Sequence, residues 1–151
     1  MIFGAVGTHS APFDRLVRAL DDIAGATSEE VVVQTGSSRY RLRFAIGFAV
    51  TSSAEFERHM REARLIVTHG GDTVLEAIEL GKPVVVVPRR RSYREHIDDH
   101  QVELAEALAR RGLVTVSEPS DLPTAIQRAG PVAVRSDPSR LIEAIRAALA
   151  G

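Results

Sequence analysis

The stretch "VTHGGDTVLEAIELGKPVVVVPRRRSY", Val67 to Tyr93, places two adjacent glycines between a strand-like run and a helix-like run. An apolar run ends at Thr68, two glycines follow, and a helical pattern begins near Thr73. Adjacent glycines are conformationally costly unless the backbone turns sharply or a ligand approaches it closely. The order of apolar run, helical pattern and valine run at 84–87 predicts a β-α-β unit with parallel strands.

The same alternation extends over the rest of the chain. β-branched runs predict strands, and apolar residues at helical spacing predict helices. The predicted strands are 1–6, 29–36, 44–50, 65–68, 84–88 and 114–117, and the predicted helices are 13–23, 53–63, 73–80, 97–111 and 141–149. Segments 117–123 and 128–138 are predicted to be connecting loops. We therefore expect a doubly wound parallel α/β sheet, Rossmann-like, in a single domain over residues 1–151.

Composition excludes several classes of protein. The chain has 151 residues, of which 44% are hydrophobic and 26% charged, as in a soluble globular domain. The net charge of -1 argues against a dedicated nucleic-acid binder. The sequence contains no cysteine, so disulfides and thiolate metal sites are excluded. It shows no signal peptide and no apolar run near the roughly 20 residues that span a bilayer.

The double glycine has two interpretations. The start of a helix exposes unpaired N–H groups and a positive dipole end, which bind anions, and Gly70 and Gly71 would let a phosphate approach. Glu76 lies one turn further on, where a carboxylate can accept hydrogen bonds from two ribose hydroxyls. Alternatively, Thr73 and Glu76 form a capping box and the glycines only allow a tight turn.

A longer pattern favours the first interpretation. The segment Leu65 to Gly112 resembles the donor-binding half of family 28 glycosyltransferases of the GT-B fold. The beginning "VGTHSAPFDRLVRALD" and the motif "VVVQTG" are similar to small stand-alone subunits of two-part UDP-sugar transferases. These include the subunit that adds the second GlcNAc to dolichol-linked sugar, and bacterial exopolysaccharide subunits. The resemblance extends from Met1 to about Val116.

The resemblance implies a role for several residues. It assigns the donor diphosphate to Gly7, Thr8, His9, His69, Gly70, Gly71 and Thr73, the ribose to Glu76, and the donor sugar to Asp99, His100 and Gln101. Uracil is expected near the backbone of 50–53. Asp72 departs from the family, in which a small or hydroxyl residue is common, and its charge would oppose a diphosphate unless it points away or pairs with an arginine.

Two further groups of residues invite interpretation. The arginines 89, 90, 91 and 94 are either a solvated surface, a region that steers the diphosphate, or a contact for anionic lipid head groups. His96 and His100, with Asp98 and Asp99, lie near one helix start, but their spacing does not favour a metal site. The family's inverting chemistry needs no metal and no cofactor in this half, because the UDP-sugar is the substrate.

The expected activity is incomplete in this chain. Inverting transfer needs a general base, and no clear base can be identified. The base is expected in a partner, with His9 as the alternative within this chain. We therefore expect a donor-binding subunit that docks, in the cytoplasm, onto a membrane-associated partner carrying a lipid-linked acceptor. The competing hypotheses are a regulatory nucleotide-sugar-binding module and a structural subunit with a vestigial cleft. The sequence does not identify the sugar or the acceptor.

Overall fold

A parallel sheet organises the protein. The computed structural model describes residues 1–8, 10–96 and 99–129, together with Glu143 and Ala147. Among these residues, six strands form one sheet: β1 (Ile2–Ala5), β2 (Val31–Gln34), β3 (Ile46–Phe48), β4 (Leu65–Thr68), β5 (Val84–Val86) and β6 (Thr115–Val116). Their order is β3-β2-β1-β4-β5-β6, and all neighbouring strands run parallel. The predicted doubly wound α/β fold is confirmed.

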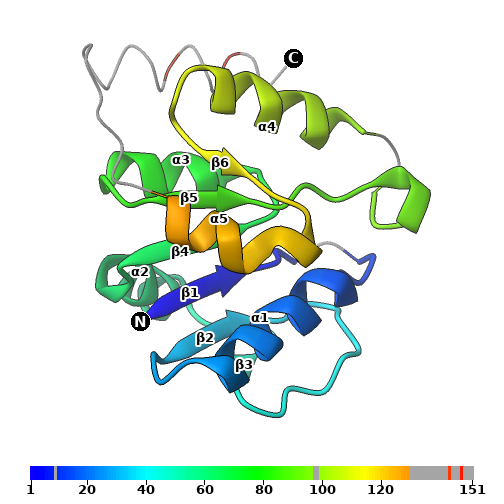
Figure 1. The fold of residues 1–151 in the computed structure, drawn as a ribbon, viewed down its shortest axis with the longest axis vertical. Helices are drawn as coiled ribbons and strands as arrows, with labels where there is room; N and C mark the ends of the chain where they lie inside the picture. Colours follow the sequence, from blue (N-terminus) through cyan, green and yellow to red (C-terminus); the bar gives the residue numbers. More distant parts are fainter. Residues whose placement is uncertain (9, 97–98, 130–142, 144–146, 148–151) are drawn as a thin grey trace.

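Helices cover both faces of the sheet. The α-helices of the described residues are α1 (Asp14–Ala26), α2 (Ser53–Glu62), α3 (Asp72–Glu79), α4 (His100–Arg110) and α5 (Leu122–Arg128). Apolar residues of α1 and α5 share one core, and those of α2, α3 and α4 share the other. Figure 1 looks onto the face that α1 and α5 cover. Within the described part of the chain, no helix has the length and apolar character needed to cross a membrane.

The valine run at 84–87 shows why the sequence requires two cores. Val84 and Val86 are buried in the core with α2, α3 and α4, whereas Val85 and Val87 are buried in the core with α1 and α5. Successive side chains of a strand point to opposite faces, so only a strand covered on both sides has apolar residues at every position.

The structure corrects the prediction in the last third of the described chain. Segment 117–123 was predicted to be a loop, but it contains a 3-10 helix, η2 (Pro119–Asp121), and the first turn of α5. Pro123 is tolerated there because N–H groups in the first turn of a helix have no partner within the helix. A proline at this position therefore removes no hydrogen bond. A 3-10 helix, η1 (Arg91–Tyr93), was also not predicted. The predicted helix 141–149 lies outside the described residues except for Glu143 and Ala147, both helical.

The connection between β2 and β3 is fixed by a buried carboxylate. Asp21 of α1 is fully buried, and its oxygens accept hydrogen bonds from the backbone N–H groups of Arg43, Phe44 and Ala45 at 2.9–3.1 Å. The hydroxyl of Tyr40 donates a further hydrogen bond at 3.2 Å. Burial by itself would raise the pKa of Asp21, but these donors outweigh it and hold the pKa below its ordinary value.

Replacing Asp21 by asparagine should destabilise the protein at neutral pH. A carboxylate with a lowered pKa contributes stability above the unfolded-state pKa of about 3.9 and loses that contribution as pH falls through the folded-state value. We expect Asp21→Asn to lower the free energy of unfolding by about 2 kcal/mol at pH 7. Urea denaturation should show the difference between the two proteins shrinking below about pH 4. A difference that stays constant into strong acid would contradict this role.

Candidate functional site

The topology of the sheet marks one crevice. The strand order reverses between β1 and β4, which are adjacent, and the chain leaves β1 for α1 on one face and β4 for α3 on the other. In such sheets a ligand binds outside the carboxyl ends of the strands at this switch point. The loops that begin with Gly7 and His69 both start there.

The two loops are in contact. Gly7 has a φ of +81°, and a Cβ atom on it would lie only 2.5 Å from Nε2 of His69. Nδ1 of His69 lies 3.4 Å from Oε1 of Gln101 in α4, and the backbone N–H of Arg89 donates to the same oxygen at 3.3 Å. A Cβ atom on Gly70 would have the side chain of Gln101 as its nearest neighbour, at 3.7 Å. Gly7, His69, Gly70 and Gln101, all named from the sequence, therefore converge from two loops and the first turn of α4.

The start of α3 is open. Gly71 is its N-cap, with φ 71° and ψ -158°, a conformation that is essentially restricted to glycine, and no side chain caps the helix. A Cβ atom on Gly71 would meet no atom within 4 Å. Thr73 is the second residue of the helix and not its N-cap, so the capping-box interpretation is wrong. Uncapped N–H groups beside open space are an anion-binding geometry.

A pocket of about 570 Å³ lies between α2, α3 and the loops that follow β1 and β3; from α3 it is lined by Glu76 and Glu79, and the residues of the glycine turn do not line it. It brings together Thr8, Glu76 and the segment 50–53, which the sequence analysis assigned to phosphate, ribose and base. Glu76 is exposed, and Asp72, the first residue of α3, is also exposed. The pocket is lined by Thr8, Gln34, Val50, Thr51, Ser52, Ser53, Phe56, Glu57, Met60, Arg61, Glu76, Glu79 and Leu80.

Gln34 lines the candidate site, and the sequence analysis did not select it. It is buried at the carboxyl end of β2, lines the pocket, and its Oε1 accepts a hydrogen bond from the N–H of Gly7 at 3.3 Å. A Cβ atom on Gly36 would lie 2.2 Å from the carbonyl oxygen of Gly7. The motif "VVVQTG" therefore positions the Gly7 loop. In the sequence, Gln34 could have been recognised as a polar residue at the end of an apolar strand.

Arg89 has a different role from the one predicted. It is 1% exposed, so it reaches neither a phosphate nor a membrane, and that prediction is wrong for this residue. Its guanidinium donates hydrogen bonds to the carbonyl oxygens of Val6 at 2.7 Å, Ala11 at 2.8 Å and Glu95 at 3.2 Å. Burial lowers the pKa of Arg89, and the neighbouring Glu95 carboxylate opposes that shift. Arg89 therefore braces the loop after β1 against the loop after β5.

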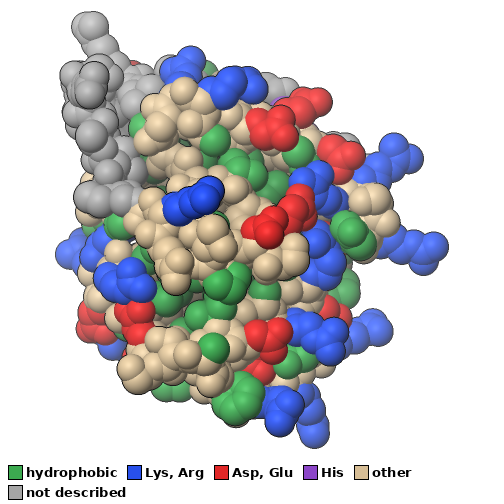
Figure 2. Space-filling model, viewed as in Figure 1, with side chains coloured by type: hydrophobic (Ala, Val, Ile, Leu, Met, Phe, Trp, Pro, Cys, Tyr) green, Lys and Arg blue, Asp and Glu red, His purple; other side chains and the backbone are tan. Residues whose placement is uncertain are grey.

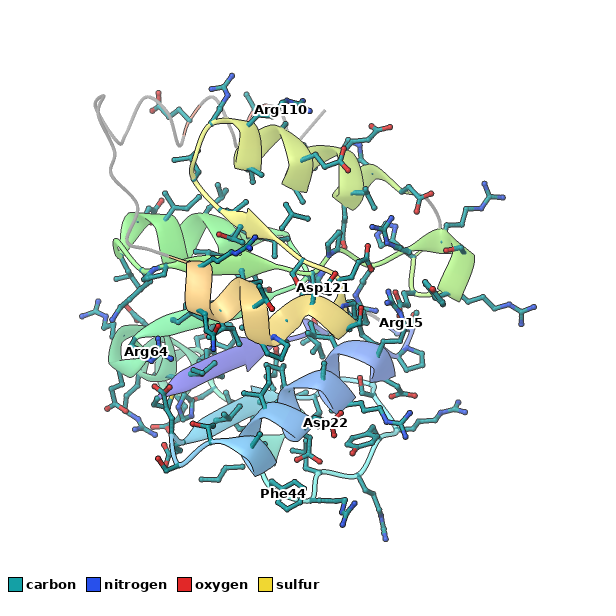
Figure 3. All side chains as sticks on the ribbon, in the orientation of Figure 1. Arg15, Asp22, Phe44, Arg64, Arg110 and Asp121 are labelled. Carbon is teal, nitrogen blue, oxygen red and sulfur yellow. The ribbon has the colours of Figure 1, made fainter. Side chains whose placement is uncertain are left out.

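A network of ion pairs supports this brace. The carboxylate of Glu95, which is 3% exposed, accepts two hydrogen bonds from Arg15 of α1, both at 2.8 Å. It also accepts one from the backbone N–H of Arg90 at 3.1 Å, and the side chain of Arg90 pairs with Glu118. Arg15, labelled in Figure 3, lies in the first turn of α1, and the network forms at this amino-terminal end of the helix.

The remaining predicted residues are exposed and do not line the 570 Å³ pocket, or they lie outside the described residues. Arg91 and Arg94 are exposed. Asp99 accepts a hydrogen bond from the N–H of Arg91 at 3.0 Å, and Nδ1 of His100 lies 4.0 Å from a carboxylate oxygen of Glu103. His9 and Asp98 fall outside the described residues. Among the described ones, no group of three or more His, Cys, Asp or Glu side chains is arranged to hold a metal ion.

A larger pocket, of about 810 Å³, lies elsewhere. Side chains of α1 and α5, together with Ile2, Glu29 and Arg64, line it. The pocket extends along the groove between α1 and α5, from Ile2 at the amino end of β1 to Arg15 in the first turn of α1, on the opposite face of the sheet from α3. Size alone therefore does not identify the site, and the crevice at the switch point remains the candidate.

Known proteins share this sequence pattern and fold. A family model described as the glycosyltransferase family 28 C-terminal domain matches residues 1–133. The chain is 39% identical over 77 residues to the UDP-N-acetylglucosamine transferase subunit ALG13 of Yarrowia lipolytica (strain CLIB 122 / E 150), which covers 50% of this chain and 36% of that protein. The match thus spans little more than a third of this relative.

Two solved structures share the fold. The NMR structure of ALG13 has a TM-score of 0.63 at 18% identity, over 93% of this chain and 94% of that one. The calicheamicin glycosyltransferase CalG4 has a TM-score of 0.63 at 22% identity, over 97% of this chain and 37% of that one. Because the family model covers most of the sequence, the chain belongs to the glycosyltransferase family 28 C-terminal domain family.

Proposed function

We propose that this chain is the donor-binding subunit of an inverting glycosyltransferase that uses a UDP-sugar, either UDP-GlcNAc or a UDP-hexose. The observation that carries the proposal is the open, glycine-flanked start of α3 beside a pocket that contains Glu76. At about 1.5 Å of rise per residue, Glu76 lies roughly one helical turn from the phosphate position. The family membership and the similarity to ALG13 support the same assignment.

The proposed chemistry assigns one part of the reaction to this chain. The bond between C1 of the sugar and the diphosphate oxygen breaks, and its electron pair stays on the diphosphate. N–H groups and the dipole at the start of α3 stabilise that negative charge, supported by Thr73 and by His69 of the preceding loop. The acceptor hydroxyl attacks the opposite face of C1 and gives its proton to a general base. We place the base in the partner, with His9 as the alternative.

The partner is the second part of the proposal. We infer a membrane-associated subunit that binds a lipid-linked glycan acceptor, with this chain held at the cytoplasmic side of the membrane through it. The similarity to a protein described as a transferase subunit supports a shared active site. CalG4 supports it too, since the matching part is 37% of that longer chain. Sugar transfer should therefore depend on co-expression with the partner.

One residue favours a second candidate function. Asp72 places a carboxylate in the first turn of α3, where it competes with a diphosphate for the same N–H groups. A regulatory module that binds a nucleotide sugar without transferring it tolerates such a residue. UDP-sugar binding without transfer in the presence of the partner would favour this alternative.

Replacing Glu76 by alanine tests the donor pocket. If the carboxylate holds the ribose, Glu76→Ala should weaken UDP-sugar binding by about 1–3 kcal/mol. The free energy of unfolding should change by less than about 0.5 kcal/mol, because Glu76 is exposed. Isothermal titration calorimetry with UDP, UDP-GlcNAc, UDP-glucose and GDP-mannose measures the first quantity, and urea denaturation the second.

Glu106→Ala is the matched control, since Glu106 is an exposed glutamate in α4 and does not line the pocket. It should leave every affinity unchanged. Equal affinity of Glu76→Ala and Glu106→Ala for UDP would contradict the ribose assignment. Stronger binding of GDP-mannose than of any uridine nucleotide would contradict the proposed donor class.

A further inference from the structure

The connection between β2 and β3 presents a row of arginines next to exposed apolar side chains. Arg39, Arg41 and Arg43 are exposed, whereas the alternating residues Tyr40 and Leu42 pack against the core shared by α1 and α5. Phe44 and Ile46, which follow, are each 56% exposed. We call Arg39, Arg41, Arg43, Phe44 and Ile46 the basic ridge. Figure 3 labels Phe44 at the edge of the molecule, beyond α1.

The backbone of the ridge is fixed by two acids of α1. Asp14 accepts hydrogen bonds from the N–H groups of Arg39 at 2.7 Å and Tyr40 at 3.3 Å. Asp21 holds the backbone from Arg43 to Ala45, as described above. A connection held at both ends displays its side chains at a low cost in conformational entropy, which favours recognition over a merely solvated loop.

The arginines of the ridge differ from other exposed arginines of the protein in their partners. In the described residues, none of the three forms a salt bridge, and the guanidinium of Arg43 lies 5.3 Å from the ring centre of Phe44. The exposed arginines of α2 differ, because Arg58 pairs with Glu55 and Glu62, and Arg61 pairs with Glu57. Figure 2 shows basic side chains next to hydrophobic ones at this edge. The ridge is thus a local positive surface on a chain whose net charge is -1.

The shape of the ridge restricts its ligand. None of the pockets described above is lined by a ridge residue, and a small anion needs a concavity to be held. An anionic bilayer needs none: its head groups attract arginine, and its interfacial layer accepts apolar side chains such as Phe44 and Ile46. We propose that the basic ridge binds directly to the surface of a membrane that contains anionic phospholipids. This contact does not depend on the donor site or on the partner subunit.

Sedimentation with lipid vesicles tests the proposal. The full chain should bind vesicles of equal parts phosphatidylglycerol and phosphatidylcholine, and should not bind vesicles of phosphatidylcholine alone. Replacing Arg39, Arg41 and Arg43 together by glutamine should weaken binding about 100-fold, and raising the salt concentration should weaken it for the original protein. Phe44→Ser should weaken binding at every salt concentration, because it removes the apolar contact.

The control removes the same charge elsewhere. Arg58, Arg110 and Arg128, all exposed on helices and none lining the donor pocket, are replaced together by glutamine, and this variant should bind vesicles much more tightly than the ridge variant. Circular dichroism confirms that both variants are folded. Equal losses in the two variants, or equal binding to neutral vesicles, would overturn the proposal. The proposal would also be overturned if the protein did not bind anionic vesicles and the basic ridge instead bound an acidic protein. UDP binding, measured on the same samples, reports on the donor site separately.

Discussion

Replacing Gly71 by alanine should weaken UDP binding by about 10- to 100-fold, the loss expected for one or two charge-assisted hydrogen bonds. The Cβ atom of alanine would extend into the open space at the start of α3, where we propose that the diphosphate binds. The variant should also lose about 1–3 kcal/mol of stability, because the conformation of Gly71 strains any other residue. Calorimetric titration with UDP at a temperature where the variant is fully folded measures the first effect.

Gly81→Ala provides the matched control. Gly81 follows the other end of α3, has a φ of +69°, and also has no atom within 4 Å of an added Cβ atom. This variant should likewise lose stability and should bind UDP as the original protein does. If both variants are destabilised and neither loses affinity, the start of α3 does not bind the diphosphate.

Replacing Arg89 by methionine should have the largest effect on stability. The change leaves the carbonyl oxygens of Val6, Ala11 and Glu95 without their donor inside the protein, which should cost about 3 kcal/mol or more. Urea denaturation measures this loss. UDP affinity should fall as well, since Arg89 fixes the carbonyl group immediately before Gly7.

Arg91→Met is the comparison from the same arginine run. Arg91 is exposed, so its replacement should change stability by less than about 0.5 kcal/mol. Arg89→Lys keeps the charge but loses the planar guanidinium that donates to several acceptors. Its stability should lie between those of Arg89→Met and Arg91→Met. Similar stabilities of Arg89→Met and Arg91→Met would show that Arg89 does not brace the loops.

Local patterns were sufficient to predict the fold. The valine runs, the alternating helices and the glycine turns are short-range features, and they gave the parallel sheet and the position of its strands. The prediction missed α5 because Pro119 and Pro123, read locally, indicate a loop. Its apolar residues Leu122, Ala125 and Ile126 form a helix by packing onto a core built from distant strands.

Residues of the candidate site could be selected from the sequence where the polar side chain and the glycine turn belong to one motif. Gly70, Gly71 and Glu76 lie within one turn and helix, and the structure places them around the switch point. Arg89 could not be distinguished from the neighbouring arginines in the sequence. Two of the carbonyl oxygens that accept its hydrogen bonds belong to residues 83 and 78 positions earlier in the chain. Gln34 was missed for the same reason: its partner, Gly7, is 27 residues away.

An NMR titration of the isotopically labelled chain with UDP shows whether the start of α3 binds the diphosphate. We expect the backbone amide signals of Gly70, Gly71 and Thr73 to shift most, with those of Gly81 and Gly112 unchanged. Shifts confined to the groove between α1 and α5, or no shift anywhere at millimolar UDP, would contradict it.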